Sequence, residues 1–167
     1  MSEIRYPYRT FRFEVEIDGM SRGGFSEVSG FDLNVDVVEY REGNDLRNTP
    51  RKLPGLTKYG NITLKWGLVG DFEFLDWIYT VAASDQAGPT GIERRNITVR
   101  LIDDAGNPGP EWLIINAWPC RYSIPDFNAL SAEVAVESVE FAHEGLTRVS
   151  SGEDAGTCLL YTSDAAD

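Results

Sequence analysis

Apolar and polar side chains alternate along much of the first half of the chain. From Thr10 to Asp18, phenylalanine, valine and isoleucine occupy every second position, and mainly charged side chains stand between them. A period of two with one apolar face is typical of a half-buried β-strand. Similar patterns predict strands over 23–31, 33–41 and 59–66, the first of them rich in glycine.

The period changes once, after the strand that ends at Trp66. Asp71 can cap a helix, and apolar side chains then recur at spacings of three and four residues up to Ala82. We expect this helix to end near Ser84, because a glycine and a proline follow shortly afterwards. It is the one segment of the sequence with a convincing helical period.

Strand patterns return in the second half, over 96–103, 111–119, 120–127 and 132–143. In the last of these the apolar positions change phase, and a β-bulge near Glu137 would explain the change. Seven or eight strands and one helix predict a mainly β fold, an antiparallel β-barrel or sandwich with one flanking α-helix.

One segment, 42–57, has no regular period. Its sequence, EGNDLRNTPRKLPGLT, contains two prolines and several turn-forming residues, which predict a long loop. A structureless loop of about 16 residues is uncommon in a compact domain and usually binds a partner or reaches one.

Basic side chains gather around this predicted loop: Arg41, Arg47, Arg51, Lys52 and Lys58. They either keep an exposed loop soluble or form a charged plug that meets an acidic surface of an identical neighbour. We favour the plug, because head-to-tail stacking uses two different patches on each copy.

The whole chain is strongly acidic. Its 167 residues include 15 basic and 27 acidic side chains, a formal charge of −12. Such a particle repels nucleic acid and anionic lipid. The excess is either an ordinary solvated surface or a surface to which anions must not adhere. No apolar run approaches the roughly 20 residues of a membrane helix, so we expect no membrane insertion.

The last ten residues, CLLYTSDAAD, resemble the translated read-through of a sequencing-library adapter. We therefore expect one domain over residues 1–157 and an artefactual tail over 158–167; the alternative is a natural polar tail. Without Asp164 and Asp167 the formal charge is −10.

The residues that often carry catalysis do not form a recognisable site. His143 is the one histidine, for which we expect a structural role, and Cys120 is expected to be a small buried hydrophobe. These residues cannot supply a zinc site. No acid, base and pocket can be assembled from the scattered carboxylates. We therefore expect that the protein is not an enzyme and that it binds no cofactor.

Three stretches resemble one family: FRFEVEIDGMSRGGFSEVSGFD, VEYREGND and PRKLPGLTKYGNITLKWGL. The late segment VAVESVEFAHEGLTRV is similar to the end of the same family, so that the resemblance runs from Tyr8 to Val149. The family is that of the inner tail tube proteins of contractile phages and extracellular contractile injection systems.

The resemblance implies an antiparallel barrel or sandwich with one helix, assembled into homohexameric rings that stack into a tube. It implies a contractile sheath, baseplate and tape-measure proteins as partners, and DNA or protein cargo in the lumen. It also implies assembly in the cytoplasm of the producing bacterium, followed by a place in the virion tail or injection particle.

The resemblance suggests two sets of functional residues. The long loop would reach neighbouring subunits or rings, with Gly43, Asn44, Asp45, Arg47, Pro50, Arg51, Lys52 and Pro54 as interface candidates. Strands that line a water-filled lumen can be polar on their inward face, and the candidates there are Asn61, Thr63, Lys65, Glu133 and Glu137. We expect an acidic lumen that keeps DNA or cargo from adhering.

Other interpretations stay open. A monomeric β-sandwich binding module for carbohydrate or protein could use Tyr6, Tyr8 and Trp112 as stacking aromatics. An enzyme would need a deep pocket with a perturbed carboxyl group. A baseplate or initiator protein of the same fold is a nearer alternative, and phage tails and toxin-delivery particles share the tube subunit.

Overall fold

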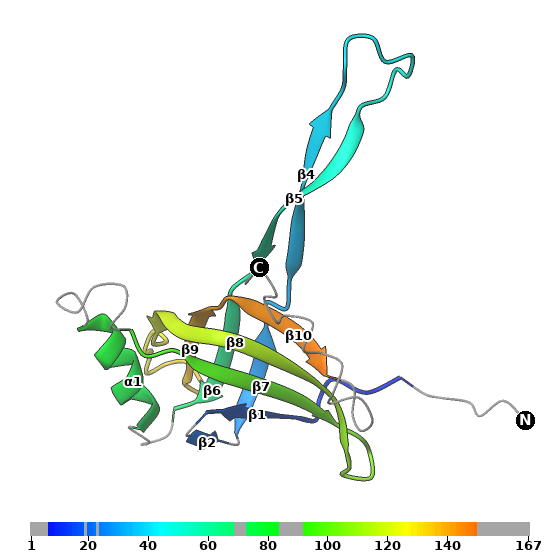
Figure 1. Cartoon of the computed structure of the whole chain (residues 1–167). Helices are drawn as coiled ribbons and strands as arrows, with labels where there is room; N and C mark the ends of the chain where they lie inside the picture. Colours follow the sequence, from blue (N-terminus) through cyan, green and yellow to red (C-terminus); the bar gives the residue numbers. More distant parts are fainter. Residues whose placement is uncertain (1–6, 19, 23, 69–72, 84–91, 150–167) are drawn as a thin grey trace, which may run out of the picture.

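The computed structural model describes residues 7–18, 20–22, 24–68, 73–83 and 92–149 (Figure 1). Within these ranges the chain forms ten strands and one helix. The elements are β1 (Phe13–Ile17), β2 (Met20–Arg22), β3 (Phe25–Ser29), β4 (Leu33–Tyr40), β5 (Arg51–Tyr59), β6 (Ile62–Gly67), α1 (Glu73–Ala82), β7 (Arg95–Ile102), β8 (Pro108–Ser123), β9 (Val136–Ala142) and β10 (Gly145–Val149).

Eight strands form one bent antiparallel sheet, in the order β2-β1-β7-β8-β9-β6-β3 with β10 also paired to β8. The long strand β8 belongs to both halves, because its first part pairs with β7 and β10 and its last part pairs with β9. We call β2, β1, β7, β10 and residues 108–117 sheet A. Residues 118–123 with β9, β6 and β3 are sheet B.

The two halves pack against each other as a sandwich, which confirms the predicted mainly β fold (Figure 1). Ile97 and Ile114 of sheet A and Leu64 and Phe141 of sheet B are fully buried between them. Burying each such side chain contributes about 1.5–3 kcal/mol. The helix α1 closes one side, where the Trp77 ring lies 5.5 Å from that of Phe141.

The strand boundaries in the second half differ from the prediction. The segments 111–119 and 120–127 were expected to be two strands, but the single strand β8 of 16 residues covers the first and continues into the second as far as Ser123, and residues 124–127 are not in a strand. It bends at Asn116, whose φ of 54° is left-handed. The short strands β2 and β10 were not predicted, and Asp71, the expected helix cap, lies outside the described residues.

The bulge expected near Glu137 is also absent. The pairing of β9 with β6 is regular along its length, and the shift of register lies in β8, between Pro119 and Arg121. The apparent change of phase has another cause: Glu137 itself lies on the buried face of β9 together with Val139 and Phe141.

The predicted loop 42–57 is only partly a loop. Its second part belongs to β5, which pairs with β4 over most of both strands, and only residues 41–50 connect them. This hairpin stands away from the sandwich (Figure 1). We call residues 33–59 the arm. Pro54 fits a strand here because a two-stranded ribbon consists of edges alone.

Both faces of the arm are open to solvent: Leu33, Val35 and Val37 are 58%, 43% and 62% exposed. An isolated two-stranded hairpin is at best marginally stable in water, so the arm lacks the apolar support that a strand normally has. In the described part of the chain, no helix has the length and hydrophobicity needed to cross a membrane.

Candidate assembly surfaces

All four strands of sheet B carry polar side chains on the face that points away from the core. Thr63 of β6 lies opposite Ser29 of β3 and Glu140 of β9 in the strand register. Lys65 lies opposite Glu27, and the two side chains form an ion pair of 3.1 Å. Its polar residues are Glu27, Ser29, Thr63, Lys65, Arg121, Ser123, Ser138 and Glu140; Val136, Ala142 and Trp118 share the same side at the two ends of β9 and at the start of this part of β8.

Charges on this face are balanced. Its acids are Glu27 and Glu140, and its bases are Lys65 and Arg121. The acid excess of the chain therefore lies elsewhere, and this face does not support the expectation of an acidic lumen. It offers hydroxyl groups and paired charges instead.

Three predicted lumen residues lie at this face. Thr63 and Lys65 point outward from β6, and the Asn61 amide, just before that strand, donates a 2.7 Å hydrogen bond to Glu140. The other two do not. Glu133 precedes β9 and lies in the connection from β8, so its predicted strand position is wrong. Glu137 is 5% exposed and points into the sandwich, so it cannot line a water-filled space.

Glu137 instead satisfies two donors inside the protein. The Trp66 indole donates to one carboxylate oxygen at 2.8 Å, and the Tyr122 hydroxyl donates to the other. Desolvation, followed by this hydrogen bond to Glu137, raises the pKa of Tyr122. The cluster joins β6, β8 and β9 and keeps a buried carboxylate from being unpaired.

We expect the cluster to make folding sensitive to alkali. The pKa of Tyr122 in the folded protein is raised above its ordinary value of 10.0. The protonated hydroxyl therefore stabilises the folded state fully below pH 10, and this stabilisation is lost as the pH rises through the pKa of the folded state. The substitution Tyr122→Phe removes this loss, at a cost of roughly 1–3 kcal/mol at neutral pH from the missing hydrogen bond. Urea unfolding at neutral and alkaline pH measures both effects; parallel alkaline losses in the two proteins would refute the assignment.

Sheet B ends on both sides in a strand with a free edge. Among the described residues, β3 pairs with β6 alone, and residues 118–123 of β8 pair with β9 alone. The strands of sheet B alternate in direction, so its two outer strands run opposite ways. The β3 edge of one copy can therefore receive the β8 edge of another as an antiparallel neighbour.

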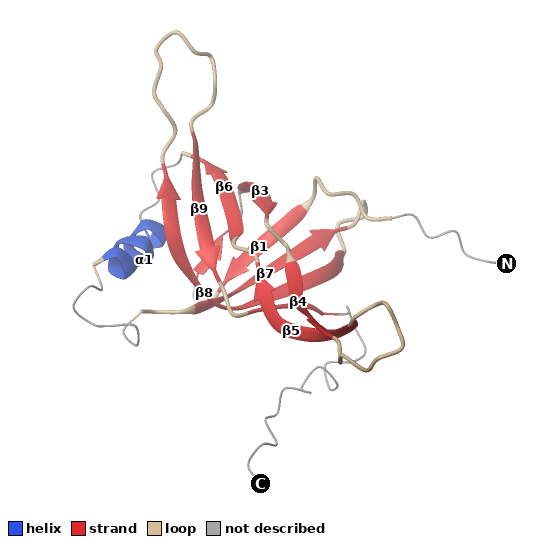
Figure 2. Cartoon of the chain, turned by 90° about the horizontal axis from the view of Figure 1, so that it is seen from above, coloured by secondary structure: helices blue, strands red, loops and turns tan. Residues whose placement is uncertain are grey.

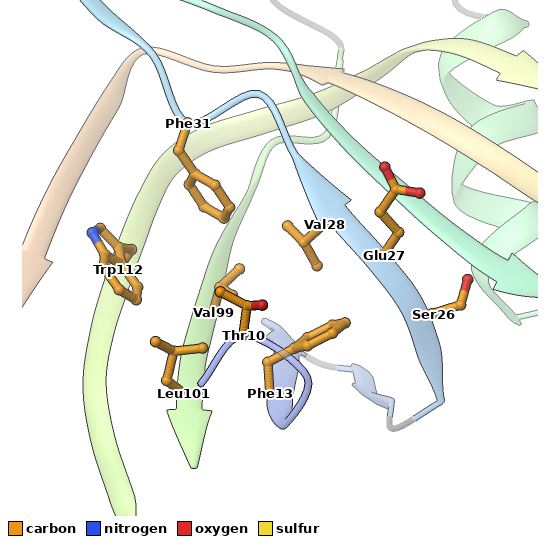
Figure 3. Close-up of a pocket in the computed structure, with 9 residues that line it drawn as sticks. All are labelled: Thr10, Phe13, Ser26, Glu27, Val28, Phe31, Val99, Leu101 and Trp112. Atoms are coloured by element: carbon orange, nitrogen blue, oxygen red, sulfur yellow. The ribbon is translucent and has the colours of Figure 1, made fainter. Parts of the chain in front are cut away.

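An apolar groove lies beside the β3 edge. It is a hollow of about 470 Å³ between β3 and the strands of sheet A (Figure 3). The rings of Phe31 and Trp112, 6.1 Å apart, stand at one end of it. Its lining consists of Thr10, Phe13, Ser26, Glu27, Val28, Phe31, Val99, Leu101 and Trp112.

Of the aromatic residues proposed for sugar stacking, Trp112 is half-buried and forms a wall of this groove. The Arg148 guanidinium lies 5.8 Å from the centre of its ring, so both Phe31 and Arg148 already contact it. Tyr8 is 50% exposed, and Tyr6 lies outside the described residues. An open aromatic platform around Trp112 is therefore not present.

The opposite side of sheet B is flanked by α1, which lies beside the end of β8 (Figures 1 and 2). Trp77 and Ile78 of this helix are buried, whereas Asp76, Tyr79 and Thr80 are exposed. Tyr79 is 59% exposed although it is a large aromatic residue. The two lateral sides of the sandwich thus differ: one is a groove beside β3, and the other is a helix beside β8.

The end of the arm holds most of the predicted interface residues. Gly43, Asn44, Asp45, Arg47 and Pro50 lie in the connection between the strands, and Arg51, Lys52 and Pro54 lie on β5. Arg41 keeps the connection compact by donating to the carbonyl oxygens of Arg47 at 3.0 Å and Asp45 at 3.2 Å. Leu46 between them is 100% exposed.

Charge is unevenly divided between the arm and the rest of the chain. Residues 33–59 hold five basic and four acidic side chains, a net charge of +1. Since the formal charge of the chain is −12, the remaining residues together carry −13. Within the described ranges, the side chains of Arg47 and Lys52 have no ion-pair partner. The arm is therefore a weakly basic projection from a strongly acidic body.

His143 and Cys120 have structural positions near the arm base and the polar face. The His143 ring nitrogens lie 2.8 Å and 3.1 Å from the carbonyl oxygens of Gly60 and Gly145, in agreement with a structural role. Cys120 was expected to be buried but is exposed, because it is the extra residue where the register of β8 shifts.

Partial desolvation, then repulsion by Glu140, raises the pKa of the Cys120 thiol and disfavours the reactive thiolate. Among the described residues, no group of three or more histidine, cysteine, aspartate or glutamate side chains could hold a metal ion.

Comparisons with known proteins agree on one kind of molecule. The family model of the T4-like virus tail tube protein gp19 matches residues 9–147. A chain in the sheath–tube complex of an extracellular contractile injection system, PVC, is 32% identical with a TM-score of 0.76, over 88% of this chain and 94% of that one. A chain in the tube-terminating cap of the anti-feeding prophage is 30% identical with a TM-score of 0.76, over 89% and 94%.

A chain in the anti-feeding prophage baseplate is 18% identical with a TM-score of 0.74, over 88% of this chain and 98% of that one, and shows likeness of fold alone. No curated protein matched the sequence. The β3 edge, the β8 edge and the groove were not foreseen from the sequence; the polar outward positions of β6 were the one signal that pointed to sheet B.

Proposed function

This chain belongs to the tail tube protein family of T4-like virus gp19, and from that premise we propose that it is the structural subunit of the inner tube of a contractile phage tail or contractile injection system. Copies of it form homohexameric rings, and the rings stack around a lumen that conducts DNA or effector cargo. The observation that supports this most is sheet B, with its polar outer face and two free edges of opposite direction.

Ring closure follows from those edges. In a ring every copy points the same way along the axis, so the β3 edge of each copy meets the β8 edge of the next in antiparallel orientation. Closure into a barrel removes all exposed edges of sheet B, which would otherwise invite aggregation. The polar face of sheet B then lines the lumen, and its balanced charges give cargo a hydrated surface with little net field.

The lateral sides of the sandwich complete the contact. The ring symmetry that places the β3 edge of one copy against the β8 edge of the next also places the groove beside β3 near α1 of that neighbour, because α1 lies beside the end of β8 (Figures 1 and 2). The exposed Tyr79 of that helix supplies an aromatic side chain for an apolar groove. Burial of such aromatic groups dominates the energetics of many subunit contacts.

The tube has further partners. A contractile sheath surrounds it, and baseplate and tape-measure proteins contact it during assembly in the cytoplasm of the producing bacterium. The similar chains come from a sheath–tube complex, a tube cap and a baseplate, which supports these partners.

Electron microscopy tests the proposal. The full chain and a variant truncated after Thr157 are purified and imaged by negative stain at increasing concentration. We expect rings with six-fold symmetry, or stacked tubes, each with a central channel. Particles that stay monomeric in both samples at every concentration would contradict the proposal and favour a monomeric binding module.

A further inference from the structure

Two side chains of opposite charge stand at the two edges of sheet B, and both lie on its polar face. Glu27 lies on β3 (Figure 3), and Arg121 lies on the last part of β8. In the order of the sheet, β9 and β6 separate these two strands. Neighbouring strands are about 4.8 Å apart, so roughly 14 Å separates the two edges and the side chains do not meet within one copy.

Arg121 has no partner in its own copy. Its side chain forms no ion pair and no hydrogen bond with any residue that the structure describes. Glu140 lies opposite it in the register of β8 and β9, but that carboxylate accepts the 2.7 Å hydrogen bond from the Asn61 amide instead. A guanidinium has five N–H donors in a fixed fork that fits a carboxylate. Arg121 thus offers its donors to a partner outside its own copy.

Glu27 is an acid that can supply this partner. Its side chain is 51% exposed, and its Oε2 atom lies 3.1 Å from the Lys65 ammonium group. An ionised carboxylate has two oxygens with about four acceptor positions, so one lysine does not use its full capacity. A second cation can therefore bind Glu27 from the side of the free β3 edge.

The inward side chains select one register between two copies. Residues 27–29 of β3 and residues 121–123 of β8 each follow a shift of register in their own strand, and within each stretch the pairing is regular. The middle residues, Val28 and Tyr122, both pack against the core. When Val28 lies opposite Tyr122 of the next copy, all three positions of both stretches are matched. A slip of one residue would turn the inward side chains to the polar face.

We propose that Arg121 of one copy binds Glu27 of the next copy across this seam, and that the ion pair fixes the register in which neighbouring copies join. The proposal rests on the ring assembly proposed above, which brings the two edges together. In the register just described, Arg121 lies opposite Ser29 and diagonal to Glu27. Diagonal neighbours in an antiparallel pair are about 7–8 Å apart, which long side chains can span.

The ion pair also decides what the polar face presents to cargo. Without it, each copy would turn one guanidinium without a partner towards the lumen, and an array of such cations binds a polyanion. With it, Glu27 lies between Lys65 of its own copy and Arg121 of the next copy. Assembly therefore orders the seam and, at the same time, neutralises the cation that would retain an anionic cargo.

Mixing two charge-reversed chains tests the ion pair. Glu27→Arg places two cations across every seam, and Arg121→Glu places two carboxylates there. Like charges opposed at an interface are strongly unfavourable, so each variant alone should form rings at a level lower by roughly tenfold or more. An equal mixture should recover rings, because alternation of the two variants restores opposite charges at every seam. Electron microscopy and size-exclusion chromatography measure the fraction of chains in rings.

Two control variants make the same charge changes outside sheet B. Glu16→Arg on the exposed side of β1 and Arg9→Glu, whose side chain is 66% exposed, should each leave ring formation unchanged. Recovery in the mixture would also show that both reversed chains fold. Reversed variants that form rings alone, or folded variants that form none when mixed, would overturn the ion pair. Absence of rings from the unmodified chain would instead overturn the proposed ring assembly.

Neutral variants give the same test without repulsion and decide the outcome if a reversed chain does not fold. Glu27→Gln, Arg121→Gln and the chain with both changes should raise the concentration for half-assembly by a similar factor, because loss of one partner already removes the pair. All three should assemble with less dependence on sodium chloride than the unmodified chain, since salt screens an exposed ion pair. Independent losses that multiply in the double variant would overturn the proposal.

Discussion

Removal of the arm should abolish tube growth while leaving the sandwich folded. The variant replaces residues 34–58 by two glycines, which is feasible because Leu33 and Tyr59 are register partners at the arm base. Partners in an antiparallel pair have Cα atoms about 4.5–5.5 Å apart, and two residues can connect such strands. We expect single rings in place of tubes, an effect on tube length far larger than that of a point substitution.

The sandwich should tolerate the deletion because the arm contributes nothing to its core. Among the residues that the structure describes, none of the buried core residues lies between Met20 and Ile62 in the chain. The body is linked to the arm base by hydrogen bonds that the variant keeps, from Gly60 to Asp32 at 3.1 Å and between His143 and Gly60. Thermal unfolding checks the fold and electron microscopy checks the assembly. Tubes of normal length from the armless chain would show that rings stack without the arm.

The strands of the sandwich could be predicted from the sequence because each has one face in a core made by this chain. Val15 and Ile17 are buried and Glu14 and Glu16 between them are exposed, as their alternation indicates. The arm shows where that argument ends. Leu33, Val35 and Val37 alternate in the same way and do form a strand, yet all three are exposed. The alternation there reflects a surface that this chain alone does not cover.

Some of the predicted lumen residues lie on the outward face of sheet B and others do not, for a related reason. Alternation predicted the outward side of β6 correctly, since Ile62, Leu64 and Trp66 show which face is inside. For β9 the same argument failed, because an acidic side chain, Glu137, occupies an inward position. Its partners Trp66 and Tyr122 are 71 and 15 residues away in the sequence, and only the folded structure brings them together.

The free edges of sheet B could not be predicted from the sequence for a further reason. An edge is defined by the absence of a neighbour, and neighbours in this sheet come from distant parts of the chain, as with β3 beside β6 and β1 beside β7. The continuity of β8 across the two halves was equally hidden, because its bend at Asn116 depends on local backbone conformation. The candidate assembly surfaces thus depend on topology, while the strands follow from the alternation of apolar and polar positions.

Among substitutions that add a single methyl group, Gly30→Ala at the junction between sheet B and the arm should lower the free energy of unfolding the most. Gly30 connects β3 to the arm with a φ of 94°, and a Cβ atom there would lie 2.0 Å from the carbonyl oxygen of Asn61. The obstacle is backbone and not a flexible side chain, so Gly30→Ala must move β3 away from the start of β6. We expect a lower free energy of unfolding and an arm that points in a wrong direction.

Gly24 provides the matched control. Its φ of 103° is also left-handed, but a Cβ atom at that position would meet nothing within 4 Å. Gly24→Ala should therefore cost only the conformational strain, about 1–3 kcal/mol, whereas Gly30→Ala should cost that strain plus the steric displacement. Urea unfolding measures the difference between the two variants, and electron microscopy measures tube length. Equal destabilisation with equal tube lengths would mean that the approach of Gly30 to Asn61 does not fix the arm; a larger loss at Gly30, accompanied by short tubes or single rings, would show that the direction of the arm is set where it leaves sheet B.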